Sequence, residues 1–68
     1  MNPLSQLSGY SINANNHVKL YYDSVANRYT VVSILENQLR VESTSDRKEA
    51  EVDYDRIVNA LRDISLPF

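Results

Sequence analysis

Hydrophobic and polar residues alternate along the chain with two different periods, one typical of a helix and one typical of strands. Near the C-terminus, apolar side chains recur every three to four residues and fall on one side of a helical wheel. This stripe consists of Ala50, Tyr54, Ile57, Val58, Leu61 and Ile64. Asp46 can cap the first turn and Glu49 can complete a capping box, so we predict one amphipathic helix over about residues 46–64.

The middle of the chain alternates with a period of two, which is typical of strands. We predict three strands, at about residues 17–23, 28–35 and 38–43. The strand at 28–35 is apolar on both alternating sets, as expected for a central strand. The predicted fold class is therefore α+β, with a three-stranded antiparallel meander and the helix packed on one face.

The lengths of the two turns predict the register and, with it, the two faces of the sheet. If Tyr22 pairs with Arg28 and Leu35 pairs with Gln38, both hairpins agree on the face that receives the helix. That face carries Val18, Leu20, Tyr22, Val32, Ile34, Leu39 and Val41. The opposite face carries Lys19, Tyr21, Tyr29, Val31, Ser33, Leu35, Arg40 and Glu42.

The start of the helix has an alternative. Residues 47–52 are mostly good helix formers, but Lys48 to Val52 also alternates. The segment therefore also fits a fourth strand, with Asp53 capping a shorter helix. Val52 favours the strand because its side chain would point to solvent in the longer helix.

Both ends of the chain lie outside the clear pattern. We treat residues 1–68 as a single small domain and residues 1–16 as a flexible or loosely docked N-terminal arm. The arm holds several apolar residues, and its segment at 10–12 can add a short edge strand. At the other end we expect Phe68 to cover the open end of the core.

Composition narrows the class of protein. A chain of 68 residues buries only about 60% of the surface of its unfolded form and needs further support. It has no cysteine, which excludes disulfides and thiolate metal sites, so we expect a homodimer. Its net charge of −2 does not indicate a nucleic-acid binder. No apolar run is long enough for a membrane span or a signal peptide, and we expect a cytoplasmic protein.

Candidate chemistry is sparse. His17 is the only histidine, and the serines occur in no nucleophile motif. Four carboxylates cluster at Glu49, Glu51, Asp53 and Asp55, but without the glycine turn of a calcium loop they are more typical of a solvated helix face. The sequence therefore predicts no enzyme, no cofactor and no metal site.

The face opposite the helix is the most informative surface, because one helix cannot cover both sides of a sheet. We predict that it forms the partner or dimer interface, with apolar and charged members. These are Tyr21, Tyr29, Val31, Leu35, Lys19 and Arg40. Three coverings remain open for this face: a dimer mate, the N-terminal arm or a foreign partner.

These features predict a non-enzymatic protein-interaction module, a small dimeric accessory or inhibitor protein that blocks or bridges a larger assembly. The hairpin, third strand and capped helix resemble many small accessory proteins of bacteria and their phages, and a phage-borne inhibitor of a host defence complex is one concrete form. Exposed helix charges predicted to face the partner are Glu51, Asp55, Arg56 and Arg62. The alternative is a small nucleic-acid-binding regulator that uses Lys19, Arg28 and Arg40 beside the tyrosines.

Overall fold

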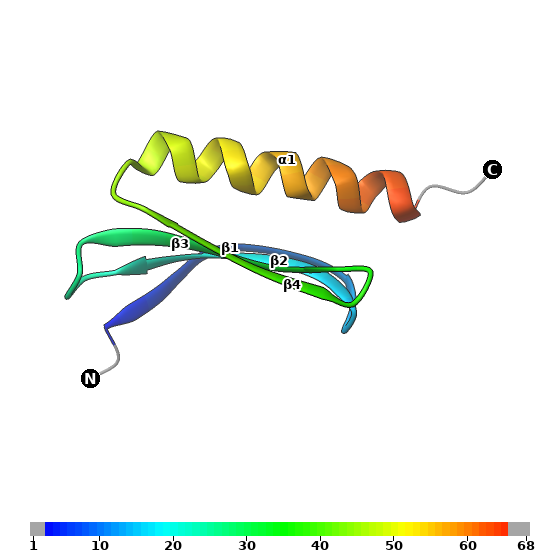
Figure 1. The fold of residues 1–68 in the computed structure, drawn as a ribbon, viewed down its shortest axis with the longest axis horizontal. Coiled ribbons are helices and arrows are strands. Elements are labelled where there is room, and N and C mark those ends of the chain that lie inside the picture. The colour runs from blue at the N-terminus through cyan, green and yellow to red at the C-terminus, as the bar shows by residue number, and fades with distance from the viewer. Residues whose placement is uncertain (1–2, 66–68) are drawn as a thin grey trace.

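A computed structural model describes residues 3–65, which form a four-stranded antiparallel sheet with one helix across one face (Figure 1). The strands are β1 (Leu4–Asn13), β2 (Asn16–Asp23), β3 (Arg28–Leu35) and β4 (Gln38–Thr44), and they lie side by side in sequence order. The helix α1 (Arg47–Ser65) follows. The predicted α+β class is confirmed, with four strands instead of three. The prediction for Phe68 falls outside the described residues.

Strand β1 is a paired edge strand of ten residues, much longer than the short segment expected at 10–12. It pairs with β2 along its whole length, with register shifts around Leu7 and Ile12. Each shift is a bulge that changes which side of the strand the following residues occupy. Residues 4–13 are therefore part of the sheet and not a flexible or loosely docked arm.

The turn between β3 and β4 was predicted correctly. Glu36 and Asn37 form a two-residue loop with φ angles of 51° and 69°, which is the type I′ geometry favoured in hairpins. This turn pairs Leu35 with Gln38 and Val32 with Val41.

The turn between β2 and β3 is one residue shorter than predicted. Asp23 pairs with Arg28, and the loop between them has four residues. The Asp23 carboxylate accepts hydrogen bonds from the backbone amides of Val25 and Ala26 at 2.9 and 3.1 Å, and Asn27 closes the loop with φ of 54°. The predicted register of this hairpin is therefore wrong by one residue, and Tyr22 pairs with Tyr29 instead of Arg28.

The long-helix alternative is the one observed, since residues 47–52 belong to α1. Asp46 caps the helix, and its carboxylate accepts from the amides of Lys48 and Glu49. The other half of the predicted capping box is not formed by Glu49. Instead, the Thr44 hydroxyl accepts from the Asp46 amide at 3.1 Å. Within residues 3–65, no helix combines the length and apolar character needed to cross a bilayer.

The core lies between α1 and the centre of the sheet, because the helix packs mainly against β2 and β3. Its buried members are Val18, Leu20, Val31, Ala50, Val58 and Leu61. Half-buried aromatic residues pack against it, among them Tyr29, whose ring lies 4.9 Å from that of Tyr22 on the neighbouring strand. The predicted helix stripe faces this core except at its end, where Ile64 is exposed.

Candidate functional site

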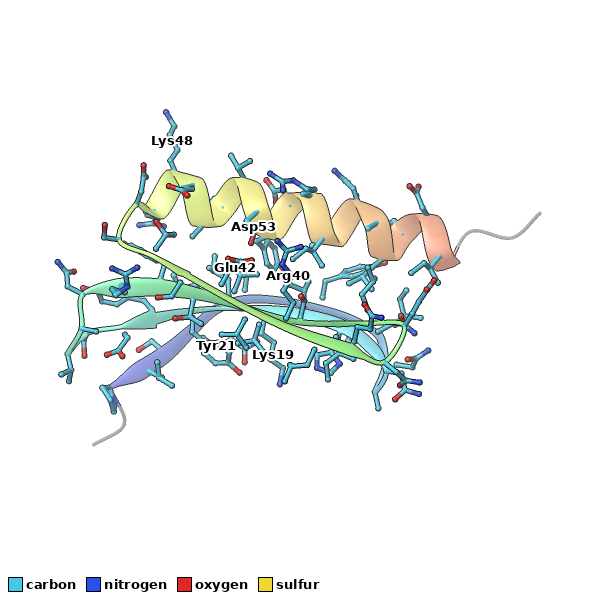
Figure 2. The ribbon with its side chains drawn as sticks, in the orientation of Figure 1. Lys19, Tyr21, Arg40, Glu42, Lys48 and Asp53 are labelled. Carbon is cyan, nitrogen blue, oxygen red and sulfur yellow. The ribbon has the colours of Figure 1, made fainter. Side chains whose placement is uncertain are left out.

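One face of the sheet has no helix on it, and we call it the outer face. Residues that pair directly across neighbouring strands point to the same side, so the registers define its members. Across β2, β3 and β4 they are His17, Lys19, Tyr21, Asp23, Arg28, Thr30, Val32, Ile34, Leu39, Val41 and Ser43. Figure 2 shows Lys19 and Tyr21 on the side of the sheet away from α1.

The outer face is apolar at its centre and open to solvent. Ile34 pairs with Leu39 and Val32 pairs with Val41, which brings four aliphatic side chains into one block beside Tyr21. Leu39 is 67% exposed and Val41 is 58% exposed. We call this block together with Tyr21 the outer patch. A contiguous apolar group of this kind is typical of an interaction surface.

The six residues predicted as one interface lie on two different faces. Lys19 and Tyr21 are on the outer face as predicted. The other four, Tyr29, Val31, Leu35 and Arg40, are on the helix side, because the first hairpin is shifted by one residue. Val31 is 2% exposed and belongs to the core, so its prediction as a surface residue was wrong.

The aliphatic members of the outer patch were predicted to lie on the face that receives the helix. Those four residues are Val32, Ile34, Leu39 and Val41. The signal that would have placed them correctly was the loop chemistry after β2, where Asp23 and Asn27 favour the shorter turn. Pairing Tyr22 with Tyr29 is a second signal, since aromatic pairs stabilise neighbouring strands.

A charged groove lies along the other side of β4, between that strand and the first half of α1. We call it the edge groove, and its volume is about 530 Å³. Arg40 and Glu42 line it from β4, and Asp53 and Arg56 line it from α1. Figure 2 shows Arg40, Glu42 and Asp53 together in the space between the strand and the helix.

Arg40 forms an ion pair with Glu42 on its own strand and lies within the electrostatic reach of Asp53 on α1. Its Nε donates to Glu42 Oε1 at 2.8 Å, and this hydrogen bond raises the pKa of the Arg40 guanidinium, with smaller help from the charge of Asp53. Asp53 Oδ1 lies 3.8 Å from Arg56 Nη1, whereas its buried Oδ2 has no hydrogen-bond partner in the described residues. The edge groove therefore carries two ion pairs, Arg40 with Glu42 on β4 and Arg56 with Asp53 on α1.

The four helix charges predicted to meet a partner are all exposed. Glu51 pairs with Arg47 at 3.6 Å, one helical turn away, and the guanidinium of Arg62 lies 5.7 Å from the centre of the Tyr10 ring. Asp55 and Arg56 complete the set. The four charges lie on α1, with Arg56 at the rim of the edge groove, so the set does not form one surface with the outer patch.

The part of the chain that the structure describes contains no group of three or more His, Cys, Asp or Glu side chains that could hold a metal ion. Asp53 faces the edge groove, away from the solvated side on which Glu51 lies. His17 is half-buried on the outer face at the start of β2. It has neither a nucleophile nor a carboxylate hydrogen-bonded to it among the bonds observed.

Comparisons of the chain with models of known protein families, with curated proteins and with solved structures found no match. What the chain can bind must therefore be argued from its surfaces. Within the described residues, the outer patch is an apolar surface that the helix does not cover, and the edge groove is a charged one.

Proposed function

We propose that this protein is a non-enzymatic binding module that acts in the cytoplasm and attaches to another protein through the outer patch. The observation that carries the proposal is the exposure of Leu39 and Val41 beside the half-buried Val32, Ile34 and Tyr21. Such a module would work as a small accessory or inhibitor protein that occupies a surface of a larger assembly. A phage-borne inhibitor of a host defence complex remains one concrete version.

The position of β1 strengthens this proposal. The sequence left open that the N-terminal arm folds over the exposed sheet face, but residues 4–13 instead extend the sheet at its other edge. They cannot also cover the outer patch, which lies on β2, β3 and β4. Of the three coverings that the sequence suggested, a dimer mate and a foreign partner therefore remain.

The size of the outer patch sets the strength that can be expected of it. Covering roughly 300 Å² of apolar surface contributes about 8 kcal/mol before costs. Association itself costs at least about 4 kcal/mol and often more. The outer patch alone therefore supports weak binding, and tight binding requires a second contribution from charged groups or from a second copy of the chain.

The alternative function, nucleic-acid binding, has less support from the arrangement. Of the cations named for it, Lys19 and Arg28 are on the outer face with Tyr21, whereas Arg40 lies in the edge groove. The guanidinium of Arg28 is also engaged, since it donates to the hydroxyl and the carbonyl of Ser43 at 3.0 and 3.1 Å. One tyrosine with one unengaged cation is a poor stacking platform for bases.

The test is affinity capture from host cells, with quantitative mass spectrometry of the proteins retained by wild type and variants. Leu39→Ser and Tyr21→Ser remove apolar surface from the outer patch, and each is expected to reduce the captured partner at least tenfold. Val52→Ser is the matched control, because Val52 is an exposed aliphatic residue on α1 with 57% exposure. It should capture the partner as wild type does.

Two results would contradict the proposal. If Leu39→Ser and Tyr21→Ser capture as much partner as Val52→Ser, the outer patch is not the binding surface. If Glu51→Lys with Asp55→Lys abolishes capture while the outer-patch variants do not, the partner binds the helix. Retention of single-stranded RNA or DNA that falls steeply with salt and is lost in Lys19→Glu would instead support the nucleic-acid alternative.

A further inference from the structure

Strand β4 is an open edge of the sheet, and it lacks the features that protect the opposite edge. Strand β1 carries two bulges and follows Pro3, which are common ways to prevent an edge from pairing with another strand. Strand β4 pairs with β3 over seven residues without any register shift, and it contains neither proline nor glycine. Its free side is therefore straight enough to accept a further strand.

The hairpin turn determines which backbone groups of β4 point outward. In a type I′ turn the two flanking residues, here Leu35 and Gln38, form a hydrogen-bonded pair, and bonded and non-bonded pairs then alternate along the strands. Arg40 and Glu42 therefore bond to β3, whereas Leu39, Val41 and Ser43 direct their N–H and C=O groups to the open side.

The contacts of Arg28 agree with this assignment. Its guanidinium reaches the backbone carbonyl of Ser43 at 3.1 Å, which requires that carbonyl to be accessible to a side chain. A carbonyl oxygen has two lone pairs, so Ser43 can still accept a further hydrogen bond. The open side of β4 thus offers three residues with exposed backbone groups.

The side chains of β4 are complementary to those of a second, antiparallel β4. We propose that β4 pairs antiparallel with β4 of a second copy of this chain, with Val41 of each copy opposite Val41 of the other. In this register Arg40 lies opposite Glu42 of the second copy, and Leu39 lies opposite Ser43. Both charge pairs are attractive, and every outward backbone group named above finds a partner.

Neighbouring registers are disfavoured by charge. The two-fold axis of an antiparallel edge pair is perpendicular to the sheet, so both helices lie on the same side and residues of the same face must be opposite. Centring the pair on Arg40 places two arginines opposite each other, and centring it on Glu42 places two carboxylates opposite each other. Of these three registers, only the one centred on Val41 avoids like charges.

The two helices do not obstruct this arrangement. Each α1 packs over β2 and β3, so four strand spacings of about 4.8 Å separate the two helix axes, or roughly 19 Å in total. A helix with its side chains is about 10–12 Å wide. The two edge grooves then merge into one channel whose floor carries the Arg40 and Glu42 pairs.

The charges set the register more than they set the affinity. Arg40 and Glu42 already form an ion pair within one chain, and their side chains are 66% and 49% exposed. Pairing exchanges that contact for one between copies, which gains little. The affinity comes from about six backbone hydrogen bonds in the three bonded pairs and from the contact between the two Val41 side chains.

The proposed pairing of β4 needs only a second copy of this chain. It does not depend on the target protein that the proposed function assigns to the outer patch. The eight-stranded sheet joins two outer patches into one two-fold-symmetric surface, which supplies the second contribution that tight binding requires. A target met by this dimer would be contacted by Leu39 and Tyr21 of both copies.

The experiment mixes two charge-reversed variants and measures mass by analytical ultracentrifugation between about 10 µM and 1 mM. Wild type should show a species of twice 7.8 kDa. Arg40→Glu places glutamates opposite one another and Glu42→Arg places arginines opposite one another, so each alone is expected to dimerise at least tenfold more weakly. An equimolar mixture of the two should dimerise again, because every opposed pair is then attractive. Arg47→Glu and Glu51→Arg are the matched charge controls on α1 and should behave as wild type.

A second variant tests the backbone of the edge. Val41→Pro removes an N–H that β3 does not use, so it should abolish dimerisation while the circular dichroism spectrum stays that of the folded monomer.

Wild type that remains monomeric at 1 mM, or single charge variants that dimerise as wild type does, would overturn the proposal. Loss of the dimer in Tyr21→Ser, with no effect of charge reversal, would place the dimer on the outer face instead. Loss of target capture in Tyr21→Ser with the dimer intact would separate the two surfaces.

Discussion

The register between β2 and β3 can be tested by truncating two adjacent valines. Val31 is 2% exposed and packs under α1, whereas Val32 is half-buried on the outer face. Replacing Val31 by alanine removes two buried methyl groups, and the burial of each contributes about 0.8 kcal/mol to the free energy of unfolding. A residual cavity of about 40 Å³ adds roughly 1 kcal/mol, so the expected loss in the free energy of unfolding is about 2.5 kcal/mol. The same change at Val32 leaves no enclosed cavity and should cost less than about 1 kcal/mol.

The comparison is internally controlled, because both variants lose the same β-propensity on the same central strand. Urea denaturation followed by circular dichroism measures both, at low temperature so that the weaker variant still has a folded baseline. With an m-value of about 1 kcal/mol/M, the two midpoints should differ by roughly 1.5 M. The reverse order, with Val32→Ala the more damaging, would refute the observed register and restore the one in which Tyr22 pairs with Arg28.

Three further changes test the helix start, the hairpin turn and a half-buried tyrosine. Asp46→Ala removes the acceptor for the first helical amides and should lower the free energy of unfolding by about 1 kcal/mol in urea denaturation, whereas Ser45→Ala next to it should not. Glu36→Asn places a residue that tolerates positive φ at a φ of 51° and should raise the free energy of unfolding by up to about 1 kcal/mol. Burial raises the pKa of the Tyr54 hydroxyl above its ordinary value of 10.0, with help from Asp55, so the folded state holds that proton more tightly than the unfolded state. Its contribution to stability is complete below pH 10 and is lost as the pH rises further, and Tyr54→Phe should flatten this decline in unfolding curves measured at increasing pH.

The periodic parts of the sequence predicted the elements well, but the register of the first hairpin needed information that periodicity does not contain. Strand β3 is apolar on both faces, so the hydrophobic pattern fits either phase equally. The choice is made in the loop, where the Asp23 carboxylate holds two amides and Asn27 adopts a positive φ. A difference of one residue there moved Val31 into the core and Val32 out of it.

Strand β1 could not be read from alternation for a different reason. Its two bulges, around Leu7 and Ile12, each reset the phase, so no stretch alternates long enough to give a clear signal. The apolar residues of the predicted arm are explained by the fold, since Tyr10 and Ile12 pack against the core. Hydrophobic content without a regular period is what a bulged edge strand produces.

The reversed faces of β4 explain why the proposed binding surfaces lie where they do. Alternation predicted that Leu39 and Val41 face the helix and that Arg40 and Glu42 face away from it. Such an arrangement is expected for a strand that lies directly beneath the helix. The helix instead lies over β2 and β3, so the side of β4 that faces it remains partly hydrated, and charged residues are tolerated there at little cost. The aliphatic residues are then left on a face that nothing in the described chain covers. A strand with attractive charges on one side, bare aliphatic groups on the other and an open backbone between them favours a partner at its edge.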